Sequence, residues 1–560
     1  MEKIYDVIIP GGGLAGLCLS VQLKRAKPDI SILILESMDT VAPTAAHKVG
    51  ESTVELATHY MREVLDLKGY LEEHELPKQG LRFFFPTKTK QDISERVEFG
   101  PHNRLKVPSH QLDRGTLENY LMKHTQTLGT EIIMGARAKA VEFGPETHTV
   151  TYGKDGADVT VTAKWVADAT GRGSLLKRKM KFQKEMDHAV NAAWWRLRGE
   201  IDINDWSENK EWVNYLEPKI RYLATVHFMD KGYWLWVIPL GSHNTSIGIV
   251  ADPAIHPFET YNTYEKALTW MEKNEPLAYR MLKPLGEGDG LMDFRILKHF
   301  AHDSGRLYSA DRWGVTGEAG AFLDPLYSPG SDFIAMNNTW LSDLILRNLD
   351  GEDITIRASI YEEAHKAHLE NWVPIYQNKY PLMGSAQIMI FNICWDWAIY
   401  WGVPCLLFTN KGFTNLKVAK ELFAADDSLG RQFGRLNKIM QDLFRAWLPY
   451  ETELFSNIYV DCFDVECVRH LQLDMEIQYE PKQLVEKIKM NIELLEKVAA
   501  QMFRLISHKA KGTSLTMNVD PYAISLTQAN DEQHAKGMPY DAMIADDLSK
   551  IWFTKDKVMA

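Results

Sequence analysis

A glycine-rich turn between a buried strand and a helix constrains this chain more than any other feature. Residues 4–9 predict a buried parallel strand, residues 14–27 a helix, and residues 30–36 a second strand. The turn after the first strand has the pattern G-x-G-x-x-G, which is formed by Gly11, Gly13 and Gly16. Together these elements predict a β-α-β unit that binds a dinucleotide.

Each residue of this turn has a distinct role in such a site. Gly11 permits the tight turn, Gly13 lets a pyrophosphate approach the backbone, and Gly16 allows the helix to pack closely on the strand. The helix N-terminus, at Leu14 and Ala15, attracts the anion. At the end of the second strand, Glu36 and Ser37 follow at the spacing expected for the acceptor of a ribose hydroxyl.

The composition is that of a globular protein with no expected affinity for polyanions. The 560 residues are 45% hydrophobic and 25% charged, so the chain can bury a large core. The formal charge of -12 is spread along the sequence, and the longest basic block is residues 177–181, so nucleic acid is not an expected partner. The five cysteines form no C-x-x-C pair, which argues against a disulfide framework or a metal site and favours the cytoplasm.

Two segments bear on membrane targeting. Residues 1–6 lead directly into the first strand and leave no room for a signal peptide. Residues 386–408 are long and apolar enough to suggest a membrane span, but Asn392, Asp396 and a Gly-Val-Pro break at 402–404 interrupt them. We therefore expect a buried or pocket-lining helix there rather than a membrane span, and peripheral membrane contact is the alternative left open.

The remaining patterns divide the chain into three parts. Strand signals at 149–152 and 159–167 are followed, between residues 191 and 250, by alternating segments rich in Trp, Tyr and Val, which predict an antiparallel sheet. After residue 339 apolar residues recur at helical spacing, as in 483–506, until a polar tail begins near Lys509. We expect an α/β fold with a Rossmann-type cofactor domain over 1–185 and 300–345, an antiparallel-sheet substrate layer over 186–299, and a mostly helical region over 346–560.

Three further segments favour FAD over NAD as the dinucleotide. Arg114 lies in a segment that resembles the one whose arginine contacts the FAD phosphates, and Asp168 lies in a segment that resembles a strand end of FAD hydroxylases. The third segment resembles the one that receives the ribityl chain, and it contains Gly317 and Glu318, a position where Asp is usual. No second G-x-G-x-x-G is present, so we expect NAD(P)H to bind only transiently or not at all, with a partner flavin reductase as the source of reduced flavin.

The chain also resembles the flavin-dependent halogenase family, within the FAD-dependent aromatic hydroxylase-type flavoproteins. The markers lie within the first 345 residues: a G-E-S loop (Gly50, Glu51 and Ser52), a W-x-W-x-I-P string with Trp234 and Trp236, and a 322–330 segment with Asp324, Pro325, Tyr327, Ser328 and Gly330. The resemblance implies that reduced FAD and O2 form a flavin hydroperoxide. In halogenases halide attacks that peroxide, and hypohalous acid crosses a tunnel to a lysine beside the substrate. Glu51 and Ser52 would shape the flavin edge, and the wall of the reaction chamber would be Trp234, Trp236, Phe83, Phe84 and Tyr327.

One departure from the family pattern concerns that lysine. The family places it on a strand after the G-E-S loop, in a pattern like G-x-x-F-K, and the ungapped counterpart here has Phe84 in its place. Arg82 could share that strand face, but a guanidinium stays protonated and cannot easily form a haloamine. The nearby lysines, Lys78, Lys88 and Lys90, are interpreted as ordinary surface residues.

The other departure concerns the halide, which the family holds on backbone N–H groups in the segment that matches 328–330. Pro329 has no N–H to offer. In a dry pocket a charge-assisted hydrogen bond contributes about 1.5–3 kcal/mol, so the loss would weaken halide binding about tenfold or more.

These departures favour a halogenase-like monooxygenase that transfers oxygen to an aromatic or polyketide-type substrate of secondary metabolism. Halogenation of an aromatic substrate, with Arg82 or a displaced lysine as the activating group, is the alternative. An oxidase, a dehydrogenase or desaturase and a non-catalytic FAD-binding protein remain further possibilities. The sequence does not distinguish a free substrate from one tethered to a carrier protein.

Overall fold

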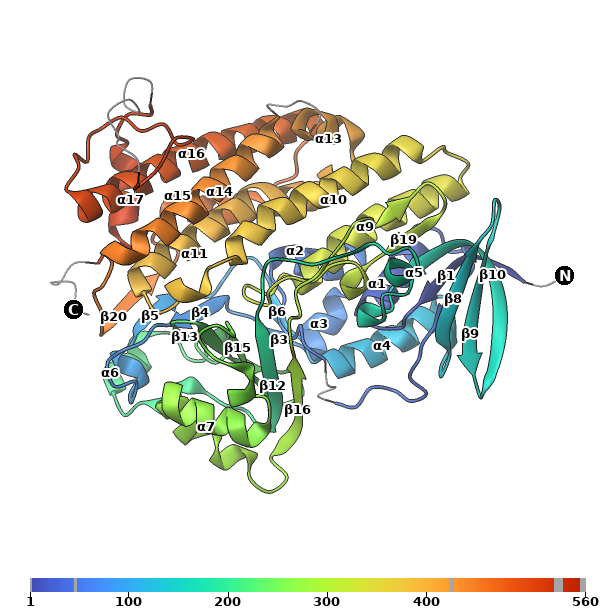
Figure 1. Cartoon of the computed structure of the whole chain (residues 1–560), viewed down its shortest axis with the longest axis horizontal. Coiled ribbons are helices and arrows are strands. Elements are labelled where there is room, and N and C mark those ends of the chain that lie inside the picture. Colours follow the sequence, from blue (N-terminus) through green and yellow to red (C-terminus); the bar gives the residue numbers. More distant parts are fainter. Residues whose placement is uncertain (1–2, 45–47, 424–427, 528–536, 554–560) are drawn as a thin grey trace.

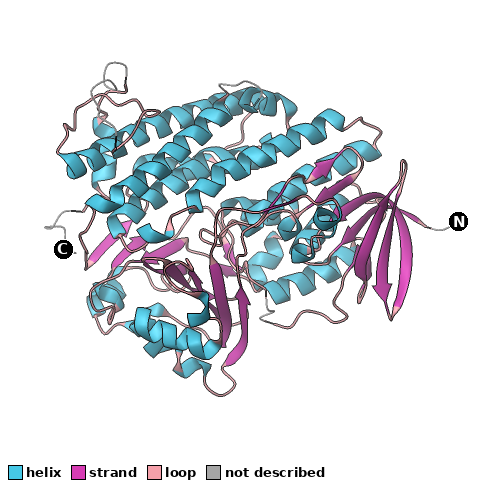
Figure 2. Ribbon diagram, viewed as in Figure 1, coloured by secondary structure: helices cyan, strands magenta, loops and turns pink. Residues whose placement is uncertain are grey.

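The protein contains two large sheets and a layer of C-terminal helices that packs over both (Figure 1). The computed structural model describes residues 3–44, 48–423, 428–527 and 537–553. Figure 2 shows that the parallel core with its flanking helices and the second, twisted sheet lie side by side beneath the long helices. The α/β class and the helical C-terminal region are therefore as predicted.

The first sheet is built around the glycine-rich turn. Its central strands are parallel, with β2 and β10 on either side of β1, and Val7 pairs with both Ile32 and Trp165. In the order of the sheet the strands are β18 (Tyr308–Ser309), β19 (Trp313–Val315), β10 (Ala157–Asp168), β1 (Ile4–Pro10), β2 (Ile32–Leu35) and β7 (Glu131–Ile133). In addition, β9 (His148–Lys154) pairs with β10, and β8 (Arg137–Phe143) pairs with β9. Parallel strands buried on both faces explain why residues 4–9 and 30–36 are so apolar.

The second sheet is mostly antiparallel, and only the β13–β4 and β5–β20 pairs are parallel. Its order is β16 (Leu291–Leu297), β12 (Asn191–Arg198), β15 (Asn244–Ala251), β14 (Tyr233–Pro239), β13 (Thr225–Asp230), β4 (Leu81–Phe84), β5 (Val97–Gly100) and β20 (Ile458–Asp461). β4, β5 and β20 lie outside the range predicted for this layer, because they join the sheet through non-local pairing that a local pattern does not reveal. Two short pairs, β3 (Leu76–Pro77) with β6 (His110–Gln111) and β11 (Gln183–Lys184) with β17 (Asp303–Ser304), complete the strands.

The helices of the first 300 residues flank the sheets. They are α1 (Leu14–Ala26), α2 (Glu55–His59), α3 (Lys68–His74), α4 (Arg114–Thr127), α5 (Leu175–Lys179), α6 (Lys210–Tyr215), α7 (Tyr264–Asn274) and α8 (Pro276–Leu282). The glycine motif positions α1 directly after β1, as the sequence predicts.

The C-terminal helices form the upper layer in Figure 1. They are α9 (Gly330–Leu349), α10 (Thr355–Tyr376), α11 (Ala386–Tyr400), α12 (Leu406–Thr409), α13 (Leu416–Phe423), α14 (Leu429–Trp447), α15 (Glu466–Asp474), α16 (Pro481–Lys511) and α17 (Ala542–Ser549). A π-helical turn, Trp401–Cys405, joins α11 to α12. α17 corrects the expectation of a plain polar tail, because Ile544 and Leu548 are buried and anchor it to the fold.

The segment Ala386–Thr409 is long and apolar enough to cross a membrane, but 94% of the most apolar window is buried within the fold. Its buried side chains include Asn392 and Asp396, which hydrogen-bond to Gln441 of α14. This is the buried, pocket-lining helix that the sequence predicts.

Candidate active site

A cleft of about 1440 Å³ runs between the two sheets. It is lined by the glycine-rich turn, the G-E-S loop, the tryptophans of β14 and the 316–334 segment that leads into α9. These segments are far apart in the sequence, and most of the predicted site residues lie along this one cleft. The exceptions are Gly16, Arg82, Phe83, Phe84, Asp168 and Tyr327.

The glycine-rich turn forms a cradle that side chains would block. Gly11 has φ +106°, and a Cβ there would lie 2.1 Å from the carbonyl oxygen of Ala169. A Cβ on Gly16 would lie 2.1 Å from the carbonyl oxygen of Gly11, so this glycine serves packing rather than the cleft. A Cβ on Gly13, by contrast, would point into open space, and Gly13 lines the cleft with Leu14 and Ala15. The backbone at the start of α1 is thus open to a pyrophosphate, and the site fits a dinucleotide.

Glu36 shapes the ribose end of the same cradle. Its Oε2 accepts a hydrogen bond of 2.7 Å from the backbone N–H of Gly12, and its Oε1 accepts one of 2.7 Å from Met38. Glu36 and Ser37 both line the cleft. The carboxylate is therefore fixed in place with lone pairs still free to accept from ribose hydroxyls.

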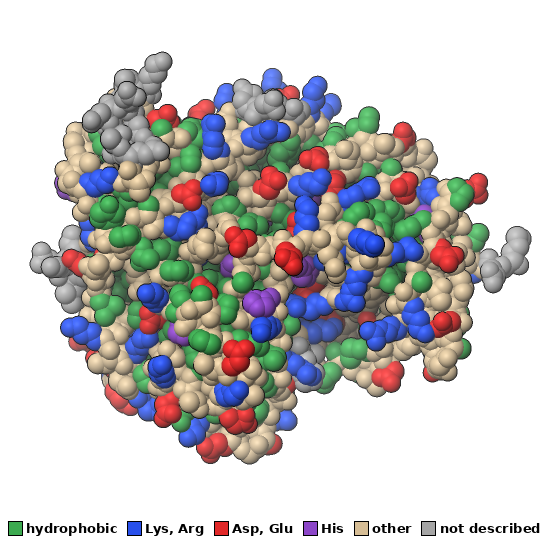
Figure 3. Space-filling model, viewed as in Figure 1, with side chains coloured by type: hydrophobic (Ala, Val, Ile, Leu, Met, Phe, Trp, Pro, Cys, Tyr) green, Lys and Arg blue, Asp and Glu red, His purple; other side chains and the backbone are tan. Residues whose placement is uncertain are grey.

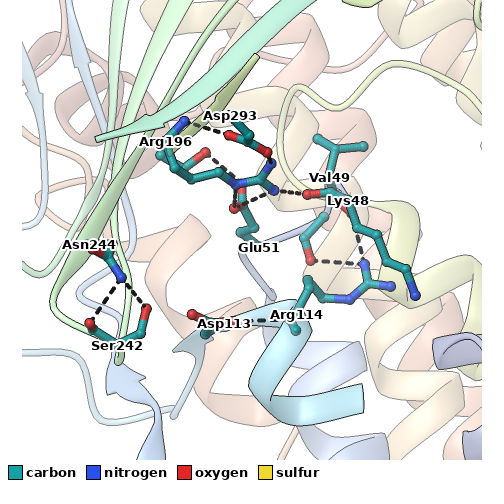
Figure 4. A network of polar contacts seen from close by, with 12 residues as sticks. Lys48, Val49, Glu51, Asp113, Arg114, Arg196, Ser242, Asn244 and Asp293 are labelled. Atoms are coloured by element: carbon teal, nitrogen blue, oxygen red, sulfur yellow. Dashed lines mark hydrogen bonds and ion pairs between the residues drawn. The ribbon is translucent and has the colours of Figure 1, made fainter. Parts of the chain in front are cut away.

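The G-E-S loop is held by a buried ionic network (Figure 4). Arg196 donates from Nε to Glu51 Oε1 at 2.8 Å and from Nη1 to Asp293 at 2.7 Å, and its Nη2 binds the carbonyl of Lys48. Ser246 donates to the other oxygen of Glu51 at 2.6 Å. Burial raises the pKa of Glu51 even though Arg196 opposes the shift. With both oxygens engaged, Glu51 is best described as an anchor for Gly50 and Ser52 at the cleft wall.

Arg114 has a different environment from the one expected. Its guanidinium donates to the carbonyl of Val49 at 2.8 Å and to Glu118 at 2.6 Å, so it braces the G-E-S loop as Figure 4 shows. Arg114 still lines the cleft. Additional basic side chains line the outer part of the cleft, on β8 and α5. Figure 3 shows Lys and Arg gathered there, to the right of centre. These residues are Arg137, Lys139, Arg178 and Lys179.

Asp168 does not reach the cleft, which corrects its predicted role in cofactor binding. The side chain is fully buried, where it accepts from Thr170 N at 3.0 Å and from Leu176 N at 2.7 Å. Burial raises its pKa despite these hydrogen bonds. Asp168 therefore fixes the turn whose backbone, at Ala169 and Thr170, lines the cleft.

The 316–326 segment lies against the cradle. Gly317 has φ +61°, and a Cβ there would lie 2.8 Å from Ala15 Cβ. Glu318 pairs with Arg172 at 3.2 Å at the partly exposed edge of the cleft. Farther in, Asp324 accepts from Tyr380 OH at 2.6 Å and contacts His188 Nε2 at 2.8 Å, so Asp324 orders the loop as well as lining the cleft with Pro325.

The loop before α9 is strained at the point where two cavities meet. Tyr327 and Ser328 have φ of +71° and +61°, which non-glycine residues adopt only at a cost of about 1–3 kcal/mol each. Ser328 faces the cleft, Tyr327 faces a second, inner pocket, and Pro329 lines both. Such strain is typical of functional loops.

Pro329 is less harmful to anion binding than expected. It is the N-cap residue of α9, so the free N–H groups of the helix start belong to the residues that follow it. Two of these, Gly330 and Ser331, line the cleft. One donor is absent, but a helix start with its backbone N–H groups remains beside the cleft.

Arg82 and Phe84 face away from the reaction chamber, which corrects both predictions. Phe83, between them on β4, stacks on His227 with a ring-centroid distance of 4.5 Å, and its ring centroid lies 6.3 Å from that of Tyr327. Arg82 is completely buried in an ion pair with Glu98, and Phe84 stacks on Phe228 at 5.5 Å in a separate core. Side chains alternate along a strand, so Arg82 and Phe84 share the face opposite to Phe83.

Lys78, interpreted from sequence as a surface residue, is buried in the inner pocket. It is 2% exposed and its Nζ donates to the carbonyl of Thr53 at 2.7 Å. The same pocket is lined by Glu55, Asp332, Tyr327, Pro329 and a set of aromatic residues. These are Trp372, Tyr376, Trp397, Tyr400, Trp401 and Phe463.

Burial in this pocket makes the neutral form of the Lys78 amine accessible near neutral pH. Burial lowers the pKa of Lys78 to about 7, although the carboxylates of Glu55 and Asp332 act in the other direction. Burial also raises the pKa of Asp332 to about 7, against the hydrogen bonds from Tyr400 OH at 2.8 Å and Ala57 N at 2.9 Å. A lysine with a pKa near neutrality can act as a nucleophile.

Aromatic side chains of the second sheet form the wall between the cleft and the inner part of the molecule. Trp234 and Trp236 lie 5.5 Å apart on one face of β14, and both line the cleft with Trp194. His227, which sequence analysis did not select, also lines it, and burial lowers its pKa to about 3. Trp234 and Trp236 therefore line the cleft, as the sequence predicts.

Known proteins resemble this chain over much of its length. A family model described as FAD binding domain matches residues 4–248. A flavin-dependent halogenase of Dictyostelium discoideum, chlA, is 28% identical over 435 residues, which cover 71% of this chain and 70% of that protein. The chain is therefore similar to flavin-dependent halogenases and contains an FAD binding domain. The predicted FAD cofactor and oxidoreductase class are thereby confirmed.

Other relatives are less similar in sequence. A Pseudomonas fluorescens chlorinase of pyrrole-2-carbonyl groups on a peptidyl-carrier protein is 24% identical, with 66% of this chain and 82% of that protein covered. The crystal structure of halogenase PltM with phloroglucinol and FAD superposes with a TM-score of 0.60 at 17% identity, over 88% of this chain and 96% of that one. At that identity the superposition supports the fold alone.

Proposed function

We propose that this flavoenzyme halogenates an aromatic compound and that Lys78 carries the electrophilic halogen to it. The observation that supports this most strongly is the burial of Lys78 in a pocket that shares a lining residue, Pro329, with the cofactor cleft. The absence of a lysine at position 84 had favoured monooxygenation, and Lys78 removes that objection.

The residues of the chain can perform each step around the halogen. Reduced FAD, when bound, supplies with O2 the oxidising power that converts a halide ion into hypohalous acid. The neutral Lys78 amine attacks the halogen, so that an N–halogen bond forms and water leaves. The haloamine then transfers the halogen to a ring carbon, and Lys78 regains a proton as the ring loses one. Asp332 lines the same pocket and is the carboxyl group we assign to relay that proton.

The substrate we propose is an electron-rich aromatic ring, free or tethered to a carrier protein. The inner pocket is lined by aromatic side chains, which favour a planar ring. The relatives include a halogenase of tetracycline and a chlorinase of a carrier-bound pyrrole. Because the described cysteines are free thiols, we also propose the cytoplasm as its compartment.

Monooxygenation remains the second candidate because Pro329 removes one donor from the helix start beside the cleft. The two candidates give different products. Mass spectrometry of products made with bromide, with free hypohalite scavenged by methionine, distinguishes a bromine substituent from an added oxygen atom. A regioselective brominated product supports the proposal, and an oxygenated product that is indifferent to bromide overturns it.

The rate of halogenation should depend on pH through Lys78. Only the neutral amine attacks hypohalous acid, and the pKa of Lys78 is about 7. The single-turnover rate with pre-reduced FAD should therefore fall about tenfold per pH unit below 7 and level off above it. The carboxylate of Asp332 favours the ammonium form of Lys78, so Asp332→Asn should lower the pKa of Lys78. The pH below which the rate falls should therefore shift to a lower value. A rate that does not change across pH 7 would contradict the assignment.

We further expect a separate flavin reductase to act as partner. The chain has one glycine-rich dinucleotide motif, and we assign it to FAD. NAD(P)H alone should therefore reduce the bound flavin slowly, and an added flavin reductase should support turnover. Stopped-flow absorbance checks this, and rapid stoichiometric reduction by NADPH would instead indicate a self-sufficient enzyme.

A further inference from the structure

The outer mouth of the cofactor cleft carries a concentration of basic side chains, here called the basic rim. β8 and α5 pack against each other at this mouth, and the turn after β10 lies beside them. All of the rim side chains line the cleft and are exposed to solvent. They are Arg137 and Lys139 of β8, Arg172 of the turn, and Arg178 and Lys179 of α5.

Most of the charge of the basic rim is not neutralised by carboxylates. Lys139 and Arg172 form ion pairs at the surface, with Asp158 and Glu318. The other three, Arg137, Arg178 and Lys179, pair with no carboxylate among the residues that the structure describes. Arg178 instead donates to the backbone carbonyl of Arg172 at 3.0 Å, which holds its guanidinium at the edge of the cleft.

The acidic side chains that lie deeper in the cleft leave this positive charge in place. Glu51 is bound by Arg196, and Glu118 is bound by both Arg114 and Lys48. These carboxylates are already compensated by cations of their own. The mouth of the cleft therefore carries an excess of positive charge.

This local charge is opposite in sign to that of the whole molecule. The formal net charge of the chain is -12, so an anion is repelled by the average surface. A cleft that is lined by one sign of charge focuses the field and raises the local concentration of the opposite ion. Such focusing increases the rate of association by about 10- to 10³-fold, and salt weakens it.

The anion whose path crosses the rim is FAD. The open backbone at Gly13 and the carboxylate of Glu36, which fit the pyrophosphate and the ribose, lie in the same cleft as the rim. The rim side chains are exposed and mostly unpaired, which suits brief contact with a charged ligand in solution. Under the proposed function reduced FAD comes from a separate reductase and is consumed by O2 in solution, so rapid capture preserves the reductant.

We propose that the basic rim steers free FAD into the cofactor cleft by attracting its pyrophosphate. The rim acts before FAD is bound, and the glycine-rich cradle then holds the cofactor. The inference rests on the proposed function for reduced FAD as the form that arrives from solution. The steering itself is a property of the charges at the cleft mouth and does not depend on the reaction.

Stopped-flow mixing of the apoprotein with FAD tests the steering without turnover. Flavin fluorescence gives the association rate from its dependence on FAD concentration and the dissociation rate from the intercept. For the wild type we expect the association rate to fall at least about tenfold between about 0.01 M and about 1 M salt. The triple variant Arg137→Glu, Arg178→Glu and Lys179→Glu should associate about 10- to 100-fold more slowly at low salt, with little remaining salt dependence and a dissociation rate within about twofold of the wild type.

A second triple variant controls for the change in net charge. Lys482→Glu, Lys489→Glu and Lys497→Glu alter the formal charge of the chain by the same amount, on exposed positions of α16 that do not line the cleft. This variant should associate with FAD nearly as fast as the wild type and keep the salt dependence. If the rim variant does not fold, the milder change Arg137→Gln with Lys179→Gln decides by the same criterion.

The outcomes separate this inference from the proposed function. A salt-dependent association that the rim variant loses and the α16 variant keeps supports steering, even if no halogenated product forms. Association that is indifferent to salt, or equally slow in both triple variants, overturns it even if halogenation is observed. Faster dissociation with unchanged association would place the rim against bound FAD, and slower delivery from a reductase with unchanged association of free FAD would assign the rim to an acidic protein; either result overturns the proposal.

Discussion

Replacement of Lys78 by methionine is expected to lower the rate of regioselective halogenation at least about 10³-fold while FAD binding is unchanged. Methionine nearly preserves the volume of the buried stem and removes the amine that would accept the halogen. The hydrogen bond lost is the one from Nζ to the carbonyl of Thr53, together with the attraction to Glu55 and Asp332, and the buried stem is retained, so the fold should persist. The measurement is mass spectrometry of brominated product under methionine scavenging, with flavin content determined by absorbance.

Two controls make this experiment specific. Lys78→Arg keeps a cation but not a nucleophilic amine, and it should be as inactive as the methionine variant. Lys90→Met removes a partly buried lysine that binds Asp230 and Tyr233 and does not line the inner pocket, and it should retain activity. Regioselective bromination by Lys78→Met would remove the foundation of the proposed mechanism.

The contrast between Lys78 and Phe84 shows what the sequence could predict. The glycine motif, α1 and the end of β2 are local, so Gly11, Gly13 and Glu36 could be placed from spacing alone. The local sequence does not indicate which side chains of β4 face the chamber, because residues 81–85 are nearly all apolar and do not alternate with polar residues. Its orientation is set by pairing with β13, where Phe83 lies opposite His227.

Lys78 was missed for a related reason. Its position depends on the β3–β6 pair and on the hydrogen bond from its backbone N–H to Ser109 O, 2.8 Å long, which no short pattern encodes. Pro329 likewise could be recognised as a lost donor, but its location at the N-cap of α9 requires the helix boundary. Local motifs thus defined the cofactor cradle, whereas the chemistry depends on long-range pairing.

Gly13→Asp is expected to reduce FAD affinity about 10²- to 10³-fold without loss of the fold. A Cβ on Gly13 meets no atom within 4 Å, so the new side chain can enter the cleft without displacing protein. Its carboxylate would then occupy the path of the pyrophosphate at the start of α1, where it repels the phosphates and blocks their backbone hydrogen bonds, each worth about 1.5–3 kcal/mol. Titration of the apoprotein with FAD, followed by flavin fluorescence, gives the affinity.

The other two glycines of the motif would not give so clear a result. At Gly11 and Gly16 a Cβ would lie 2.1 Å from a backbone carbonyl oxygen, so substitution there disturbs the fold as well as the site. Gly69→Asp is the matched control, because Gly69 is an exposed glycine of α3 whose Cβ also meets open space. It should bind FAD as the wild type does. Equal FAD affinity in Gly13→Asp and wild type would show that the pyrophosphate does not lie at this turn.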